Sequence, residues 1–174
     1  MSEEEPPALG HAAPGGFVVE RADEDDWERV RSVRLAALAD SPSAFGSTLA
    51  AEREMRESGW RDWCRDTATY LALRDGAPVG IAAGVTGVSR DERTLISMWV
   101  HPAHRGTGVS TALLEAVRDW AVRDGATRLV LWVTRTNHAA AALYQRAGFA
   151  RTGTSKPLPS NPALIEEQRA LDLR

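Results

Sequence analysis

A strand, a glycine-rich turn, a helix and a second strand follow one another in the middle of this 174-residue chain. Residues 94–100 (TLISMWV) predict the first strand, and apolar residues recur at helical spacing over residues 109–120. Gly125 ends that helix, and the nearly continuous apolar run at 128–133 (RLVLWV) is typical of a strand buried on both faces. This order predicts a parallel pair of strands at the centre of a sheet.

Further helices and strands surround this unit. The Asp-Gly pair in the turn at 75–78 predicts a hairpin between two of the strands. The pattern predicts other helices at 27–38, 49–64 and 138–147, and other strands at 17–20, 69–73, 79–88, 150–154 and 168–173. The whole order predicts a mixed α/β sheet of about six to seven strands flanked by about four helices.

Length and composition limit the class of protein. One domain at 17–174 suits this length, and residues 1–16, acidic and rich in Pro, Ala and Gly, are expected to form a disordered tail. Lys plus Arg (21) nearly balances Asp plus Glu (24), so no bulk charge indicates a nucleic-acid partner. The longest uncharged run, 76–89, is too short for a membrane span. A single cysteine and the lack of a leader-like pattern predict a cytoplasmic location.

Residues 105–110 (RGTGVS) lie between the predicted strand at 94–100 and the following helix. Free N–H groups and the positive end of the helix dipole converge at such a junction, and glycines let the backbone approach an anion closely. A phosphate-binding turn is therefore predicted, with a tight turn that holds no ligand as the alternative. The turn lacks the Gly-Lys-Ser/Thr of a P-loop and the third glycine of a dinucleotide-binding motif.

At these residues the chain resembles the GNAT superfamily of N-acetyltransferases, whose signature is Gln/Arg-x-x-Gly-x-Gly/Ala. Arg105-x-x-Gly108-x-Ser110 is similar to it, with Ser110 where the family has Gly or Ala. Residues 99–108 (WVHPAHRGTG) and 131–149 (LWVTRTNHAAAALYQRAGF) resemble two conserved blocks of the family. The resemblance covers roughly residues 17–174, and it implies a GNAT-like fold with a splayed parallel pair of central strands.

The resemblance also implies how acetyl-CoA, as the co-substrate, would be held. Main-chain groups of Trp99 and Val100 would pair with the pantetheine amides like an added strand. The pyrophosphate would meet the N–H groups of the turn, where Arg105 is a further phosphate partner. Asn137 would contact the pantetheine arm, and helix capping is its alternative role. The implied cofactor-binding residues are Trp99, Val100, Arg105, Gly106, Thr107, Gly108, Val109, Ser110, Asn137 and Tyr144.

Direct attack of an amine on the thioester is the mechanism that the resemblance implies. Tyr144 would be the general acid that protonates the leaving thiolate, and the N–H of Val100 would be the oxyanion donor. The alternative role of Tyr144 is to pack its helix against the sheet. The strand carboxylate that many family members use as a base is missing from residues 94–98, which leaves Glu92, just before them, as the candidate.

Acceptor-binding residues are predicted on the helix at 49–64. Glu52 and Glu54 are candidates for binding a cationic amine, with a solvated helix face as the alternative. Trp60 and Trp63 are candidates for lining the acceptor pocket, with core packing as the alternative.

The predicted function is therefore an acetyl-CoA-dependent N-acetyltransferase acting on a small-molecule or peptide amine. A non-catalytic acyl-CoA-binding or sensing module is one alternative, and an interaction domain with an empty glycine turn is another. The four histidines and the single cysteine show no ligand spacing, so no metal is expected. Homodimers are frequent in the family that the chain resembles, and a homodimer is the expected assembly if there is one.

Overall fold

The computed structural model describes residues 12–13 and 16–174, in which one sheet has the strand order β1-β2-β3-β4-β5-β6-β8-β7. The strands are β1 (Ala12–Ala13), β2 (Phe17–Arg21), β3 (Ala68–Arg74), β4 (Ala77–Thr86), β5 (Glu92–Val100), β6 (Arg128–Thr134), β7 (Ala150–Leu158) and β8 (Asn161–Asp172). The α-helices are α1 (Trp27–Asp40), α2 (Leu49–Arg53), α3 (Glu57–Asp66), α4 (Val109–Arg123) and α5 (His138–Arg146). The mixed α/β class predicted from the sequence is confirmed.

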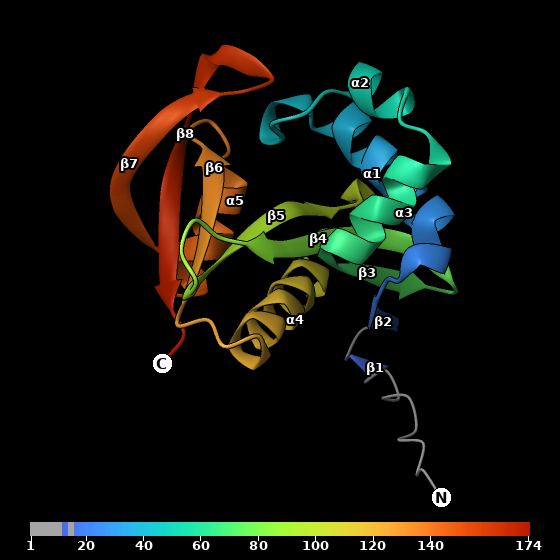
Figure 1. The fold of residues 1–174 in the computed structure, drawn as a ribbon, viewed down its shortest axis with the longest axis horizontal. Helices are drawn as coiled ribbons and strands as arrows, with labels where there is room; N and C mark the ends of the chain where they lie inside the picture. Colours follow the sequence, from blue (N-terminus) through green and yellow to red (C-terminus); the bar gives the residue numbers. More distant parts are fainter. Residues whose placement is uncertain (1–11, 14–15) are drawn as a thin grey trace, which may run out of the picture.

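Helices cover both faces of the sheet. Figure 1 shows α1 and α3 on one face of strands β3 to β5 and α4 on the opposite face. Two buried apolar clusters correspond to these layers: Leu113 and Val117 of α4 belong to one, and Val30 and Trp60 of α1 and α3 belong to the other. A membrane-spanning helix is absent from the described part of the chain.

Two predicted elements differ from the structure. The helix expected at 49–64 is divided into α2 and α3, because Arg56 between them has an extended backbone (φ −73°, ψ 163°). The final two strands are longer than expected and pair with each other as a ribbon. Most residues of β7 are exposed, so this strand has little of the apolar pattern by which a strand is recognised in a sequence. Of the predicted tail at 1–16, residues 1–11 and 14–15 lie outside the described residues.

Strands β5 and β6 separate after a short contact. Their parallel pairing runs from Glu92↔Arg128 to Thr94↔Val130. From there β6 continues against β8, whereas β5 continues against β4. Figure 1 shows the two strands diverging, and the splayed parallel pair expected from the resemblance is thus present.

A β-bulge bends β5 where the strands part. Ile81 of β4 pairs with Trp99 of β5, and Ala83 pairs with Ile96. One residue therefore lies between the paired positions in β4 and two lie between them in β5, so β5 has one extra residue here. Ser97 lies inside this step and has φ 59°, which is uncommon for a residue other than glycine. The bulge therefore changes the direction of side chains at the point where β5 loses its parallel neighbour.

Asp40, the last residue of α1, joins this helix to the end of β5. Its Oδ2 atom accepts hydrogen bonds from Trp99 Nε1 (2.9 Å), Ser41 Oγ (2.7 Å) and Arg105 Nη2 (2.6 Å). The bond from Trp99, followed by the one from Ser41, lowers the pKa of Asp40 to about 2. Arg105 Nε also donates to the carbonyl oxygen of Val100 at 3.0 Å. The first residue of the glycine-rich turn is thereby fixed to both the helix and the strand.

Gly84 of β4 lies beneath the indole of Trp120 in α4. A Cβ atom built on Gly84 would overlap the Trp120 ring, so one of the two elements must move. We expect Gly84→Ala to lower the free energy of unfolding by about 1–3 kcal/mol, measured by urea denaturation. Gly46→Ala is the control, because its Cβ would make only ordinary contacts of 3.6–3.9 Å with Pro159. Equal losses in the two variants would contradict this packing argument.

The Asp40 contacts predict a dependence of stability on acid pH. Because folding lowers the pKa of Asp40, its ionised form stabilises the fold fully above 3.8, and this stabilisation is lost as the pH falls toward about 2. We expect Asp40→Asn to melt at a lower temperature than the wild type at neutral pH. Between pH 3.8 and about 2 its melting temperature should fall less than that of the wild type. Thermal melting across the range measures both effects. The exposed Asp119→Asn variant should keep the wild-type profile, and an unchanged profile in Asp40→Asn would count against the contacts.

Candidate functional site

A groove of about 320 Å³ lies between the end of β5, the glycine-rich turn and α5. We call it the α4–α5 groove, because Ser110 of α4 and Ala140 of α5 line opposite parts of it. The predicted cofactor-binding residues that line it are Trp99, Val100, Arg105, Gly106, Ser110 and Asn137. The structure therefore brings together most of the residues chosen from the sequence.

The turn before α4 leaves room for a ligand beside its backbone. Gly106 and Gly108 have φ values of 74° and 89°, and a Cβ atom at either would meet no atom within 4 Å. Gly108 is the N-cap of α4 and supplies no side-chain cap. The first N–H groups of α4 are thus left for another acceptor, and the helix dipole favours an anion there.

The other predicted residues of the turn have structural contacts. The Thr107 hydroxyl donates a hydrogen bond to the carbonyl oxygen of His104. Val109, the first residue of α4, is buried in the apolar core. Arg105 is half-exposed, and its guanidinium bonds Asp40 and the Val100 carbonyl. Its role visible in the structure is to anchor the turn.

The pairing of β5 with β4 shows which main-chain groups face the gap. His101 N–H donates to the Val79 carbonyl at 2.8 Å, so these two form a hydrogen-bonded pair. Because antiparallel pairs alternate, the N–H of Val100 is directed away from β4, toward the side where β6 has parted. By the same alternation the main chain of Trp99 faces β4, so the predicted main-chain contact of Trp99 with the cofactor is wrong.

A smaller pocket of about 90 Å³ lies between the separated strands β5 and β6. We call it the inter-strand pocket. It shares lining residues with the α4–α5 groove, among them Met98, Asn137 and Leu143, so the two cavities adjoin. Its polar lining comes from Ser97, Thr134, Asn137 and Tyr144, and its aromatic walls are Phe45 and Trp132.

Tyr144 is buried on α5 and lines the inter-strand pocket. Its ring packs edge-to-face on Phe149, with the ring centroids 5.9 Å apart. Burial raises the pKa of the Tyr144 phenol well above its usual value of 10. The phenol is therefore protonated at neutral pH, and its O–H is able to donate to a group in the pocket.

Asn137 has the capping role that the sequence offered as one of its two alternatives. Its Oδ1 accepts a hydrogen bond from the backbone N–H of Ala140 at 3.1 Å, so it caps α5. The same residue lines both the groove and the inter-strand pocket. Because the cap uses only the amide oxygen, the NH₂ group is left to bond a ligand.

The predicted acceptor-binding residues do not come together in one pocket. Trp60 is fully buried in the core, so the prediction that it lines a pocket is wrong. Trp63 is partly buried and donates its indole N–H to the hydroxyl of Thr69. Glu54 is exposed, whereas Glu52 is buried.

Glu92, the candidate base, lies at the wrong end of its strand. It begins β5, and its carboxylate is 3.9 Å from the guanidinium of Arg128. Ser97, which lines the inter-strand pocket, lies five residues further along β5, about 16 Å away at the usual rise per residue. Glu92 is therefore too distant to take a proton at the inter-strand pocket. Within residues 12–13 and 16–174, no group of three or more His, Cys, Asp and Glu is placed to hold a metal ion.

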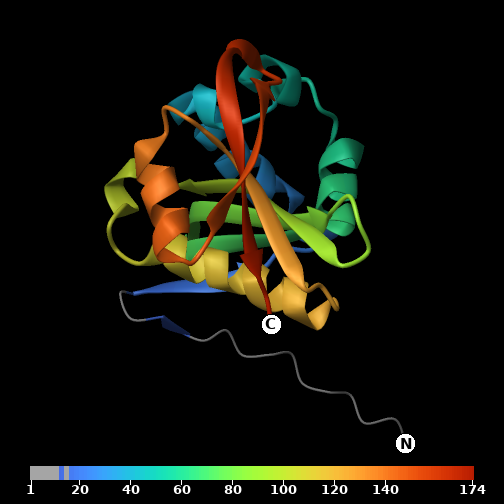
Figure 2. The same cartoon turned by 90° about the vertical axis from the view of Figure 1, so that its left-hand side faces the viewer.

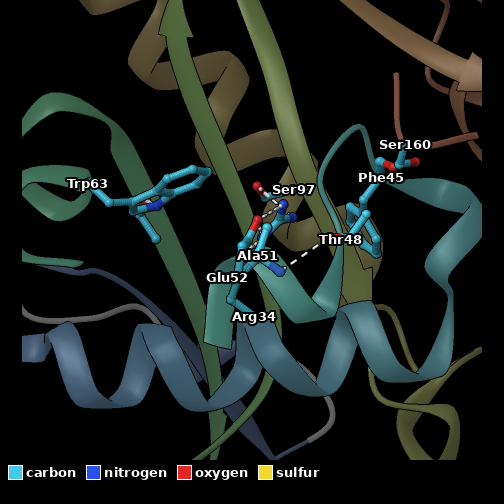
Figure 3. Close-up of polar contacts among 9 residues, drawn as sticks. Arg34, Phe45, Thr48, Ala51, Glu52, Trp63, Ser97 and Ser160 are labelled. Carbon is cyan, nitrogen blue, oxygen red and sulfur yellow. Dashed lines mark hydrogen bonds and ion pairs between the residues drawn. The ribbon is translucent and has the colours of Figure 1, made fainter. Parts of the chain in front are cut away.

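A buried polar cluster that the sequence pattern did not predict lies beside the pocket. Arg34 of α1 donates to the Glu52 carboxylate from Nε (2.9 Å) and Nη2 (2.7 Å), and from Nη1 to Ser97 Oγ (3.2 Å). The guanidinium also lies over the rings of Phe45 (4.7 Å) and Trp63 (5.5 Å), as Figure 3 shows in part. A signal was present in the sequence, because Arg34 recurs with Val30 and Leu38 on the apolar face of its helix.

The same arrangement of elements occurs in known proteins. Residues 33–149 match the family model described as the acetyltransferase (GNAT) family. An uncharacterised N-acetyltransferase of Mycobacterium bovis is 36% identical over 127 residues, which are 71% of this chain and 81% of the relative. Streptothricin acetyltransferase of Streptomyces lavendulae is 35% identical over 94 residues, 53% of this chain. Mycothiol acetyltransferase of Salinispora arenicola is 33% identical over 140 residues, 74% of this chain.

The matches span only 50% of the streptothricin relative and 42% of the mycothiol relative. Among solved structures, a GNAT-family acetyltransferase of Streptococcus pneumoniae has a TM-score of 0.74 at 20% identity, over 90% of this chain and 98% of that one. Salmonella typhimurium yncA, solved with its cofactor acetyl-CoA, has a TM-score of 0.74 at 22% identity, over 91% and 94%. These structures show a shared fold, and because the family model also matches more than half of the sequence, this chain belongs to the GNAT acetyltransferase family.

Proposed function

We propose that this protein transfers the acetyl group of acetyl-CoA to the nitrogen of an amine. The observation that carries the proposal is that a groove at the uncapped start of α4 adjoins a pocket lined by a buried phenol. The names of the relatives, which are N-acetyltransferases, support the same reaction class. A non-catalytic acyl-CoA-binding module is the alternative, and those relatives do not favour it.

The α4–α5 groove is the proposed site of the coenzyme. The diphosphate would bind the N–H groups from Gly106 to Ser110, where no Cβ atom blocks the approach at the two glycines. The pantetheine arm would lie along the open side of β5 and bond the main chain of Val100 and the NH₂ group of Asn137. The coenzyme would supply the activated acetyl thioester, and its arm would carry that thioester from the groove into the adjoining inter-strand pocket.

The reaction would be a direct displacement. The amine nitrogen forms a bond to the acetyl carbon, the carbon–sulfur bond breaks, and the nitrogen loses one proton. The Val100 N–H would stabilise the negative charge on the carbonyl oxygen, and Tyr144 would give its proton to the leaving sulfur. Because the lining of the inter-strand pocket includes no carboxylate or imidazole, the proton from nitrogen would pass to water, and water would return a proton to the Tyr144 phenolate.

The acceptor is proposed to be a small-molecule or peptide amine. Two relatives are named for small molecules, streptothricin and mycothiol, which supports the first class. A cytoplasmic location, a homodimeric assembly and the lack of a nucleic-acid partner are further proposals, which rest on the sequence alone.

Replacing Tyr144 tests the general acid. We expect Tyr144→Phe to lower kcat for acetyl transfer about a hundredfold, because the leaving thiolate loses its proton donor. Tyr70→Phe is a matched control, since Tyr70 is the other tyrosine of the chain and is equally buried, on β3. Release of free thiol from acetyl-CoA, followed across a panel of amines, measures both variants. Unchanged turnover in Tyr144→Phe would remove the phenol from the mechanism.

Replacing Gly108 tests the diphosphate site. A valine side chain at Gly108 would strain a backbone with φ 89° and would cover the first N–H groups of α4. We expect Gly108→Val to raise the Kd for coenzyme A at least about tenfold, measured by calorimetry. Gly76→Val is the control, because Gly76 has φ 79° and equally open space but lies in the turn between β3 and β4. If both variants bind coenzyme A alike, the turn does not hold the diphosphate.

A further inference from the structure

Ser97 occupies an unusual position in the inter-strand pocket. It lies within the bulge of β5, with φ 59°, and it is buried. A serine pays a conformational cost at this φ, and such residues are concentrated at functional sites. Its hydroxyl is a polar group in a pocket whose other walls are mainly apolar.

The hydrogen bond with Arg34 fixes what this hydroxyl is able to do. A guanidinium has only donors, so in the 3.2 Å contact Ser97 Oγ must be the acceptor. Within the part of the chain that the structure describes, Arg34 is the one hydrogen-bond partner of Ser97 Oγ. The hydroxyl proton of Ser97 is therefore left to be donated to a group inside the pocket.

Arg34 is held so that it cannot turn away from Ser97. Its side chain and that of Glu52 are only 6% and 5% exposed, and the pair is bonded through two guanidinium nitrogens. The rings of Phe45 and Trp63 lie against the same guanidinium. A fixed cation that bonds the serine oxygen also polarises the O–H bond, which strengthens the hydroxyl as a donor.

The hydroxyl lies on the side from which the amine would enter. Ser97 bonds α1, which covers the face of the sheet opposite to α4. The α4–α5 groove is lined by the end of β5, the glycine-rich turn, the start of α4 and α5, and its lining also includes Ser41 and Ala44 after α1. Because the coenzyme would approach the pocket from the α4 side, the amine would approach from the α1 side, where Ser97 and the ring of Phe45 line the pocket.

The wall around Ser97 is tied down at two further points. Thr134 Oγ1 donates to the carbonyl oxygen of Ser43 at 2.8 Å, and Ser160 Oγ donates to that of Phe45. Both contacts hold the segment between α1 and α2, one against β6 and the other against the turn that joins β7 to β8, and Figure 2 shows the β7–β8 ribbon reaching this segment. The ring of Phe45, which lines the same pocket as Ser97, is thereby held in place.

We propose that Ser97 selects amines that carry a hydrogen-bond-accepting oxygen close to the reactive nitrogen, as in α-amino amides, and that Arg34 positions its hydroxyl for this. The inference rests on the proposed function and names its acceptor class. An acceptor of this class would receive the Ser97 proton through its oxygen while its nitrogen faces the thioester. An alkylamine of the same shape would leave the serine hydroxyl unsatisfied, which is the costly outcome in a buried site.

Matched amines test the proposal. The first pair of probes is phenylalanine amide and 2-phenylethylamine, which differ by the carboxamide. Further pairs in the panel also differ only by an oxygen-bearing group next to the amine. Release of thiol from acetyl-CoA measures the reaction with each amine. We expect the wild-type protein to prefer the oxygen-bearing amines in kcat/KM at least about tenfold. In Ser97→Ala the ratio of the two kcat/KM values should fall to near unity, because kcat/KM decreases for the oxygen-bearing amines and not for the alkylamines. KM for acetyl-CoA should stay within about twofold of the wild-type value.

A second variant separates the hydroxyl from the backbone. Ser97→Gly also lacks the hydroxyl but accepts φ 59° without strain, so it should lose the preference as Ser97→Ala does. The exposed Ser58→Ala variant should keep the wild-type ratio. Retention of the preference in Ser97→Gly, or a wild-type protein that acetylates both members of every pair equally, would overturn this inference alone. No thiol release with any amine of the panel would overturn the proposed function and this inference together.

Discussion

The parting of β5 from β6 is the constraint on which the rest of the molecule depends. Three residue pairs hold the two strands together, and after Thr94↔Val130 each strand turns to a different neighbour. The backbone of β5 beyond that point then has an open side, and the N–H of Val100 faces it. Without the separation there would be neither an inter-strand pocket nor a place for a ligand to pair with β5.

Helix α1 supports both sides of this opening with polar side chains. Asp40 at its end bonds Trp99 and Arg105, which fixes the turn beside the α4–α5 groove. Arg34, nearly two turns earlier, bonds Glu52 and Ser97, which fixes the opposite side of the pocket. Buried ion pairs contribute little net stability because desolvation offsets their attraction, so the Arg34–Glu52 pair is better explained by the geometry it imposes than by the energy it adds.

The features of the candidate site that the structure places as the sequence predicts are encoded over short stretches of chain. The glycine turn, the cap at Asn137 and the placement of Tyr144 each depend on a few consecutive residues and on one helix. Arg34 is 18 residues from Glu52 and 63 residues from Ser97 along the chain, and no local pattern indicates that the three side chains meet. Glu92 was wrong for a related reason: its distance from the pocket depends on where β5 and β6 separate. The orientation of Trp99 depends on the register between β4 and β5, which a single strand does not reveal.

The segment between α1 and α2 is bonded at Ser43 by Thr134 and at Phe45 by Ser160, which come from distant parts of the chain. Its shape is therefore not its own property, since β6 and the β7–β8 ribbon share in setting it. Evolution of a new acceptor preference in this lineage would then require compensating changes in three separate stretches of sequence. Grafting the segment alone into a homologue should transfer its residues without transferring its selectivity.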